Sequence, residues 1–184
     1  KHNNPCGASL SNSASSSFKN ALNCDSVSAF GGIVAFNTNV DEETALSLKD
    51  IFLECVVAPS FDIEALEIFK TKKNLRVLRL PKGNLPQGKL TCSKSIMGGI
   101  LIQDCDMQEN KEDTWISVTE NTPSDQEFLD LKFAWKICKH VKSNAIVIAK
   151  DLQTLGIGAG QMNRVGASKI ALEAAKKNSF GAVL

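Results

Sequence analysis

Short runs of apolar residues, rich in β-branched side chains, alternate with longer amphipathic stretches along this chain of 184 residues. Apolar runs of this length, bounded by polar residues and glycine, are typical of buried β-strands. Strands that alternate with helices predict an α/β domain, in which helices flank a layered sheet. The predicted strands are 32–36, 55–58, 75–80, 98–102 and 144–149.

Four amphipathic stretches predict helices, because their apolar residues recur at intervals of three and four. Three begin near 41, 62 and 11, the last in a serine-rich segment that continues through Phe18. The longest is expected to start with Thr122 as the capping residue and Pro123 at its first position. Its predicted buried face consists of Phe128, Leu131, Trp135, Cys138 and Val141. Residues 81–94, rich in proline, glycine and lysine, predict a long surface loop.

Composition and charge narrow the class of protein. Hydrophobic residues make up 43% and charged residues 22%, and the formal net charge is +1, so nucleic acid is not an expected partner. The apolar runs are too short to cross a bilayer, and no signal peptide opens the sequence, so we expect neither a membrane protein nor a secreted one. The cysteines, at 6, 24, 55, 92, 105 and 138, form no Cys-x-x-Cys pair. We therefore expect no metal knuckle or redox pair, and a cytoplasmic location.

The first candidate site is the segment Lys1-His-Asn-Asn-Pro-Cys-Gly7. The imidazole of His2 can accept a proton near neutral pH, and the ammonium of Lys1 can stabilise negative charge on a carbonyl oxygen. A solvated loop that happens to contain histidine explains the same residues. A catalytic pair at a chain end would fray, so the segment either has no catalytic role or belongs to a longer protein whose preceding strand is missing.

A second candidate is the glycine-rich stretch 155–164, which leads into an alanine-rich helix. Glycines let a ligand approach the backbone, a helix N-terminus favours anions, and Arg164 adds a planar cation. A glycine-packed crossing of strand and helix is an equally good explanation. The stretch is not a dinucleotide fingerprint, because Gln161 stands where its third glycine would fall.

Two further residues could contact a ligand. Phe30, in a polar turn before a predicted strand, could stack on a flat ring, although a core aromatic would have the same pattern. Glu54, beside another predicted strand, could bind a polar group, although a solvated acid is the more ordinary explanation.

Four segments together resemble the AICAR transformylase half of the bifunctional purine-biosynthesis family, which couples AICAR formyltransferase to IMP cyclohydrolase. They are Lys1-His-Asn-Asn-Pro-Cys-Gly7, Ser28-Ala-Phe-Gly-Gly-Ile-Val-Ala-Phe-Asn37, Ser143-Asn-Ala-Ile-Val-Ile-Ala-Lys150 and Gly156-Ile-Gly-Ala-Gly-Gln-Met-Asn-Arg164. The resemblance implies that residues 1–184 are a partial transformylase domain, without the cyclohydrolase domain and the later part of the transformylase. It also implies a cytidine-deaminase-like fold. The zinc signature of that class is missing, since its second cysteine would fall at Ser9.

The same resemblance implies the reaction and the role of each site residue. A formyl group passes from the co-substrate 10-formyltetrahydrofolate to the 5-amino group of AICAR, with no metal required. His2 would be the base and Lys1 the group that stabilises the transition state. Nucleotide contacts would come from Phe30, Gly31, Asn144, Arg164 and, by a weaker match, Glu54, and Val165 would line the folate side. The resemblance also implies that the intact protein is an obligate homodimer.

Two other functions remain open at this stage. A non-catalytic nucleotide-binding or assembly module would also explain the glycine-rich helix start and the catalytic-type residues at a terminus. A nicotinamide-dependent dehydrogenase is disfavoured by Gln161.

Overall fold

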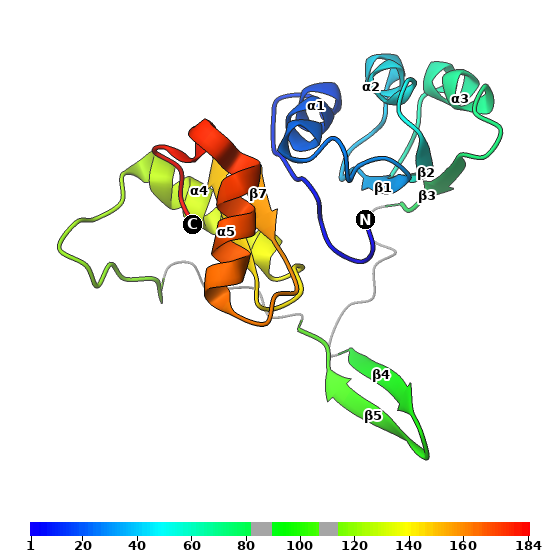
Figure 1. Cartoon of the computed structure of the whole chain (residues 1–184). Helices are drawn as coiled ribbons and strands as arrows, with labels where there is room; N and C mark the ends of the chain where they lie inside the picture. The colour runs from blue at the N-terminus through cyan, green and yellow to red at the C-terminus, as the bar shows by residue number, and fades with distance from the viewer. Residues whose placement is uncertain (82–89, 107–113) are drawn as a thin grey trace.

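A computed structural model describes residues 1–81, 90–106 and 114–184. The first half contains a parallel sheet of three strands in the order β1-β2-β3. Three helices precede or connect these strands and lie on the same side of the sheet (Figure 1). The elements are α1 (Ala14–Cys24), β1 (Gly32–Ala35), α2 (Glu42–Leu48), β2 (Leu53–Ala58), α3 (Ile63–Lys70) and β3 (Arg76–Arg79).

The main hydrophobic core lies between these helices and the sheet. Phe18 of α1, Leu48 of α2, Phe69 of α3 and Val56 of β2 are among its buried side chains. Ser13 and Asp41 accept hydrogen bonds from the backbone N–H groups of the first turns of α1 and α2, so each helix begins at a capping side chain. Burial of one face of each helix against the sheet therefore organises this half of the chain.

The second half is a two-stranded antiparallel sheet with a helix packed on each face. Successive residues of a strand point to opposite faces, so Val147 and Ala149 pack toward α4 while Ile148 packs toward α5. Val183 adds an isolated bridge to Ala149. The elements are α4 (Asp125–Cys138), β6 (Ile146–Lys150), β7 (Gln153–Gly158), α5 (Arg164–Ala175) and the short 3₁₀ helix η2 (Lys176–Ser179).

A buried carboxylate holds the turn between β6 and β7. Asp151 and Leu152 both have positive φ, 51° and 55°, as a tight two-residue hairpin turn requires. Their backbone N–H groups donate to the carboxylate of Asp130 at 3.0 and 2.7 Å, and Asp130 is only 3% exposed. The acid on α4 therefore stabilises the turn and is itself satisfied by it.

The N-terminal segment crosses to the second half and pairs with β7. The backbone N–H of Thr154 donates to the carbonyl of Ala8 at 3.0 Å, and the Thr154 hydroxyl accepts from the Ala8 N–H at 2.9 Å. The N–H of Leu10 donates to the carbonyl of Leu152 at 2.9 Å. These bonds place the start of the chain beside β7.

A separate hairpin consists of β4 (Thr91–Ile96) and β5 (Gly99–Asp104), and it projects away from both halves (Figure 1). All twelve strand residues are exposed. None of the helices in the parts of the chain just described is long and apolar enough to cross a membrane.

The predicted strands and helices are confirmed as a mixed α/β arrangement, but the described strands form three separate sheets instead of one layered sheet. The predicted loop at 81–94 is wrong from Thr91 onward, where β4 begins, and 82–89 lie outside the described residues. The predicted strand at 98–102 is confirmed as β5, but its partner β4 was missed, because its exposed residues show no alternation of apolar and polar side chains.

Two details of the longest helix are also corrected. Ser124, not Thr122, caps α4, because Ser124 and Glu127 exchange hydrogen bonds in a capping box. The buried face runs through Asp130 and Ala134, while Trp135 is 56% exposed. Val141 of the predicted face is buried and Cys138 packs against the same core, so the prediction is confirmed in part, but it did not include the buried acid Asp130.

The glycines of β7 allow α5 to approach the strand closely. A Cβ at Gly156 would lie 2.0 Å from the carbonyl oxygen of Ala171, and one at Gly158 would lie 1.9 Å from that of Ala167. Both glycines are buried and lie two residues apart on one face of the strand. Their role is therefore packing, and of the two explanations for these glycines the strand–helix crossing is the one observed.

We expect Gly158→Ala to destabilise the chain by about 1–3 kcal/mol, because α5 must move away from β7 to admit the new methyl group. Urea denaturation followed by circular dichroism measures the change in the free energy of unfolding. Gly99→Ala is the matched control, since its Cβ would have no atom nearer than 4.0 Å, and it should change stability by less than about 0.5 kcal/mol. Equal stability of the two variants would contradict the packing role.

Candidate active site

The predicted catalytic pair lies in a tight turn at residues 1–4. The N–H of Asn4 donates to the carbonyl of Lys1 at 3.0 Å, and His2 and Asn3 have φ values of 50° and 60°. Non-glycine residues seldom adopt this left-handed region, so other contacts must hold the turn. One is the side chain of Asn4, whose Oδ1 accepts from the N–H of Lys142 at 2.9 Å.

Lys1 links this turn to the predicted ring-contacting turn. Its Nζ donates to the carbonyls of Phe30 and Gly31 at 2.6 and 3.2 Å. Gly31 has a φ of +64°, and its N–H donates to the carbonyl of Phe52 at 2.8 Å. The Phe30 ring is 65% exposed and lies 5.1 Å from the Phe52 ring, between centroids. An exposed aromatic face therefore lies close to the ammonium.

A small cavity of about 260 Å³ brings the predicted catalytic pair together with neighbouring polar groups. Lys1 and His2 both line it, as do Cys6, Asp25 and Ser28. Asp25 and Ser28 were not among the predicted site residues, although both belong to the polar turn that precedes Phe30. Asp25 Oδ1 accepts from the N–H of Ser28 at 2.8 Å, which fixes the shape of that turn.

Asn144 lies two residues before β6 and is hydrogen-bonded to the glycine-rich turn. Its backbone N–H donates to the carbonyl of Gln161 at 3.0 Å, and its side-chain Nδ2 donates to the same oxygen at 2.9 Å. The peptide bond between Ser143 and Asn144 is cis. Since Lys142 also bonds Asn4, the Asn144 turn lies beside the turn that carries the catalytic pair.

Arg164 and Val165 form the first turn of α5, and both are exposed. Asn163 caps the helix, with its Oδ1 accepting from the N–H of Gly166 at 2.7 Å. The guanidinium of Arg164 therefore stands at a helix N-terminus three residues after Gln161, where an anion is favoured.

Glu54 is not joined to this arrangement by any of the hydrogen bonds described. Its Oε2 lies 2.6 Å from Nη1 of Arg76 on the adjacent strand β3. The carboxylate thus already has a cationic partner at the surface.

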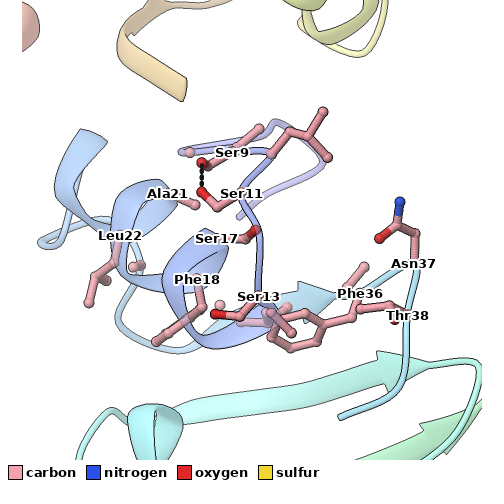
Figure 2. A pocket seen from close by; sticks show the side chains of 18 of the residues that line it. Ser9, Ser11, Ser13, Ser17, Phe18, Ala21, Leu22, Phe36, Asn37 and Thr38 are labelled. Carbon is pink, nitrogen blue, oxygen red and sulfur yellow. Dashed lines mark hydrogen bonds between the residues drawn. The ribbon is translucent and has the colours of Figure 1, made fainter. Parts of the chain in front are cut away.

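A larger cavity, of about 720 Å³, lies elsewhere and is lined by none of the eight predicted site residues. It is bordered by the N-terminal segment, α1 and the outer edge of β1. Figure 2 shows the serine side chains that surround it, with Ser9 Oγ and Ser11 Oγ 3.4 Å apart, and the side chains of Phe36 and Asn37.

The described parts of the chain contain no group of three or more histidine, cysteine, aspartate or glutamate side chains that could hold a metal ion. The spacing of the cysteines predicted no redox pair, and this prediction is wrong for two of them. Cys92 and Cys105 form a disulfide in the β4–β5 hairpin.

Comparison with known proteins gives a consistent assignment. A family model described as the AICARFT/IMPCHase bienzyme matches residues 1–174. Proteins named bifunctional purine biosynthesis protein PurH, from Prochlorococcus marinus strains MIT 9515, MED4 and MIT 9211, are 83%, 73% and 53% identical over the whole chain. The chain spans 36% of the length of each of these relatives. The match covers nearly the whole sequence, including the turns that carry the site, and the chain belongs to the AICARFT/IMPCHase bienzyme family.

Proposed function

We propose that this chain forms part of a folate-dependent formyltransferase that acts on AICAR in purine biosynthesis. The formyl group of 10-formyltetrahydrofolate would pass to the 5-amino group of the nucleotide, giving FAICAR. The observation that carries the proposal is the position of Lys1 and His2, which line one cavity while Lys1 also contacts the Phe30–Gly31 turn. Family membership supports the same reaction.

The acceptor amine is a weak nucleophile, because its lone pair is delocalised into the imidazole ring and the carboxamide. Attack on the formyl carbon leaves the amine with an extra proton and places negative charge on the formyl oxygen. A base at the amine and a cation at the oxygen therefore lower the barrier. Neither task requires a metal ion.

His2 is the proposed base, and its exposed imidazole lines the cavity. Lys1 is the proposed cation. An ammonium has three N–H donors, and the carbonyls of Phe30 and Gly31 take two of them. The third donor is left for the formyl oxygen, while the two carbonyls hold the charge in place.

The nucleotide would lie across the turns that surround this pair. Phe30 and Gly31 would contact its ring, and Asn144 and Arg164 would bind its polar and phosphate groups. Val165 is proposed to line the folate side. Glu54 is the weakest member of the set, because Arg76 already pairs with its carboxylate.

The proposal extends to the protein of which this chain is a part. Residues 1–184 would be a partial transformylase domain of the zinc-free, cytidine-deaminase-like class, in a cytoplasmic homodimer that also carries IMP cyclohydrolase activity. The alternative, a nucleotide-binding or assembly module without catalysis, loses part of its support because Gly156 and Gly158 pack against α5. A dehydrogenase is further disfavoured, since antiparallel strands precede α5.

In the full-length protein, we expect His2→Ala to lower kcat by roughly 100- to 10,000-fold, the usual contribution of a general base. AICAR binding, measured by calorimetry, should persist. His140→Ala is the matched control, because His140 is exposed just beyond α4, and it should leave turnover unchanged. Unchanged turnover in the His2 variant would refute its role as the base.

Replacing Lys1 with alanine should lower the rate at saturating substrate by about 100- to 1,000-fold, because charge on the formyl oxygen loses its partner. Steady-state kinetics separate kcat from KM. Lys19→Ala removes another surface lysine, whose Nζ lies 3.9 Å from Glu43, and should have no effect on either constant. An effect of the Lys1 substitution on KM alone would assign Lys1 to substrate binding instead.

A further inference from the structure

The β4–β5 hairpin has no hydrophobic core of its own. All residues from Thr91 to Asp104 are exposed, and Ile100 and Ile102 are 64% and 70% exposed. A two-stranded hairpin without packing is only marginally stable in water. Backbone pairing alone therefore does not account for an ordered hairpin, and another stabilising contact is needed.

The disulfide between Cys92 and Cys105 supplies such a contact at the stem. Cys92 pairs with Gln103 across the ladder, and Cys105 lies two residues beyond Gln103 on the same face. Diagonal neighbours of this kind are close enough to bond, and the two Cα atoms are 5.4 Å apart. The N–H of Cys105 donates to the carbonyl of Leu90 at 2.7 Å, so the backbone hydrogen bonds between the two strands extend as far as the disulfide.

This pair is also more accessible than two of the other cysteines. Cys92 is exposed and Cys105 half-buried, whereas Cys24 and Cys55 are buried. Burial raises the pKa of the Cys24, Cys55 and Cys138 thiols, which lowers the fraction of reactive thiolate at neutral pH. Exchange with small thiols and disulfides is thus disfavoured at Cys24, Cys55 and Cys138, whereas the exposed Cys92 is accessible to them.

We propose that Cys92 and Cys105 form a thiol–disulfide exchange site, and that the order of the β4–β5 hairpin depends on its oxidation state. The oxidant is a low-molecular-weight disulfide such as oxidised glutathione, and the reductant is a dithiol. The hairpin is closed by a covalent bond in one state and held only by backbone pairing in the other.

Thiol–disulfide exchange at this pair takes place in two steps. One cysteine thiolate attacks a sulfur of the small disulfide, forms a mixed disulfide and releases one small thiolate. The second cysteine thiolate then attacks the protein sulfur of that mixed disulfide, forms the Cys92–Cys105 bond and releases the second small thiolate. The two cysteine protons pass to solvent or to the released thiolates, and a dithiol reverses both steps.

Hydrogen exchange of the 184-residue chain, followed by mass spectrometry, tests the proposal. Peptides that cover 91–104 should lose about 100-fold in protection when a dithiol reduces the oxidised chain, which corresponds to opening a loop of this size. Peptides from β6 and β7 serve as the internal reference and should not change. Thiol counting in denaturant should give four free thiols before reduction and six after, since four cysteines are unpaired.

Variants separate this bond from other effects of the reductant. In both buffers, the double variant Cys92→Ser/Cys105→Ser should show the fast hydrogen exchange of the dithiol-treated parent chain. Cys6→Ser should respond to the dithiol like the parent chain. Each single serine variant gives a second test if the double variant fails to fold. Equal exchange of 91–104 in both buffers, or six free thiols after equilibration with oxidised glutathione, would overturn the proposal.

Discussion

The pairing of residues 8–10 with the start of β7 is the contact on which the candidate site depends. Ala8 and Thr154 exchange backbone and hydroxyl hydrogen bonds across 146 positions of sequence, and Thr154 is 1% exposed. A buried, doubly bonded threonine is costly to separate from its partners, because each group would be left unsatisfied. These hydrogen bonds fix the position of residues 1–7 relative to β7, and Asn4 then accepts a hydrogen bond from the N–H of Lys142. Without them, the turn that carries Lys1 and His2 would lose its place beside Lys142 and the Asn144 turn.

The close approach of α5 to β7 sets the other side of the site. Gly156 and Gly158 remove the side chains that would separate strand from helix, and the position of α5 determines where Arg164 begins the helix. The sequence pattern alone could not separate a packing glycine from a ligand-binding one, since both require a missing side chain. Their two-residue spacing on a buried strand face is the feature that distinguishes them, and it becomes informative only when the strand is known to extend to Gly158.

Most elements with an apolar run were predictable, whereas the polar and covalent contacts that stabilise the turns and the β4–β5 hairpin were not. Strands such as β2 and β6 have continuous apolar runs that no other structure explains as well. Asp130 was missed because hydrophobic patterns treat an acid as exposed, whereas two backbone N–H groups of the β6–β7 turn satisfy it. The disulfide was missed because the thirteen-residue spacing of Cys92 and Cys105 becomes a short distance only in a hairpin. For the candidate site, the motifs predicted Lys1, His2 and Phe30, whereas the positions of Asp25 and Ser28 beside Lys1 and His2 became visible only in the fold.

The ammonium of Lys1 shows how an exposed site can still be preorganised. A surface lysine normally samples many rotamers, and ordering it costs conformational entropy during each catalytic cycle. Here two backbone carbonyls hold Nζ in advance, and their own positions follow from the left-handed φ of Gly31 and its hydrogen bond to Phe52. A side chain at position 31 would be strained at that φ, and its Cβ would lie 3.1 Å from Nζ. Glycine at this position thus serves the placement of the charge as well as the shape of the turn, which links a backbone requirement to the formyl transfer proposed for this site.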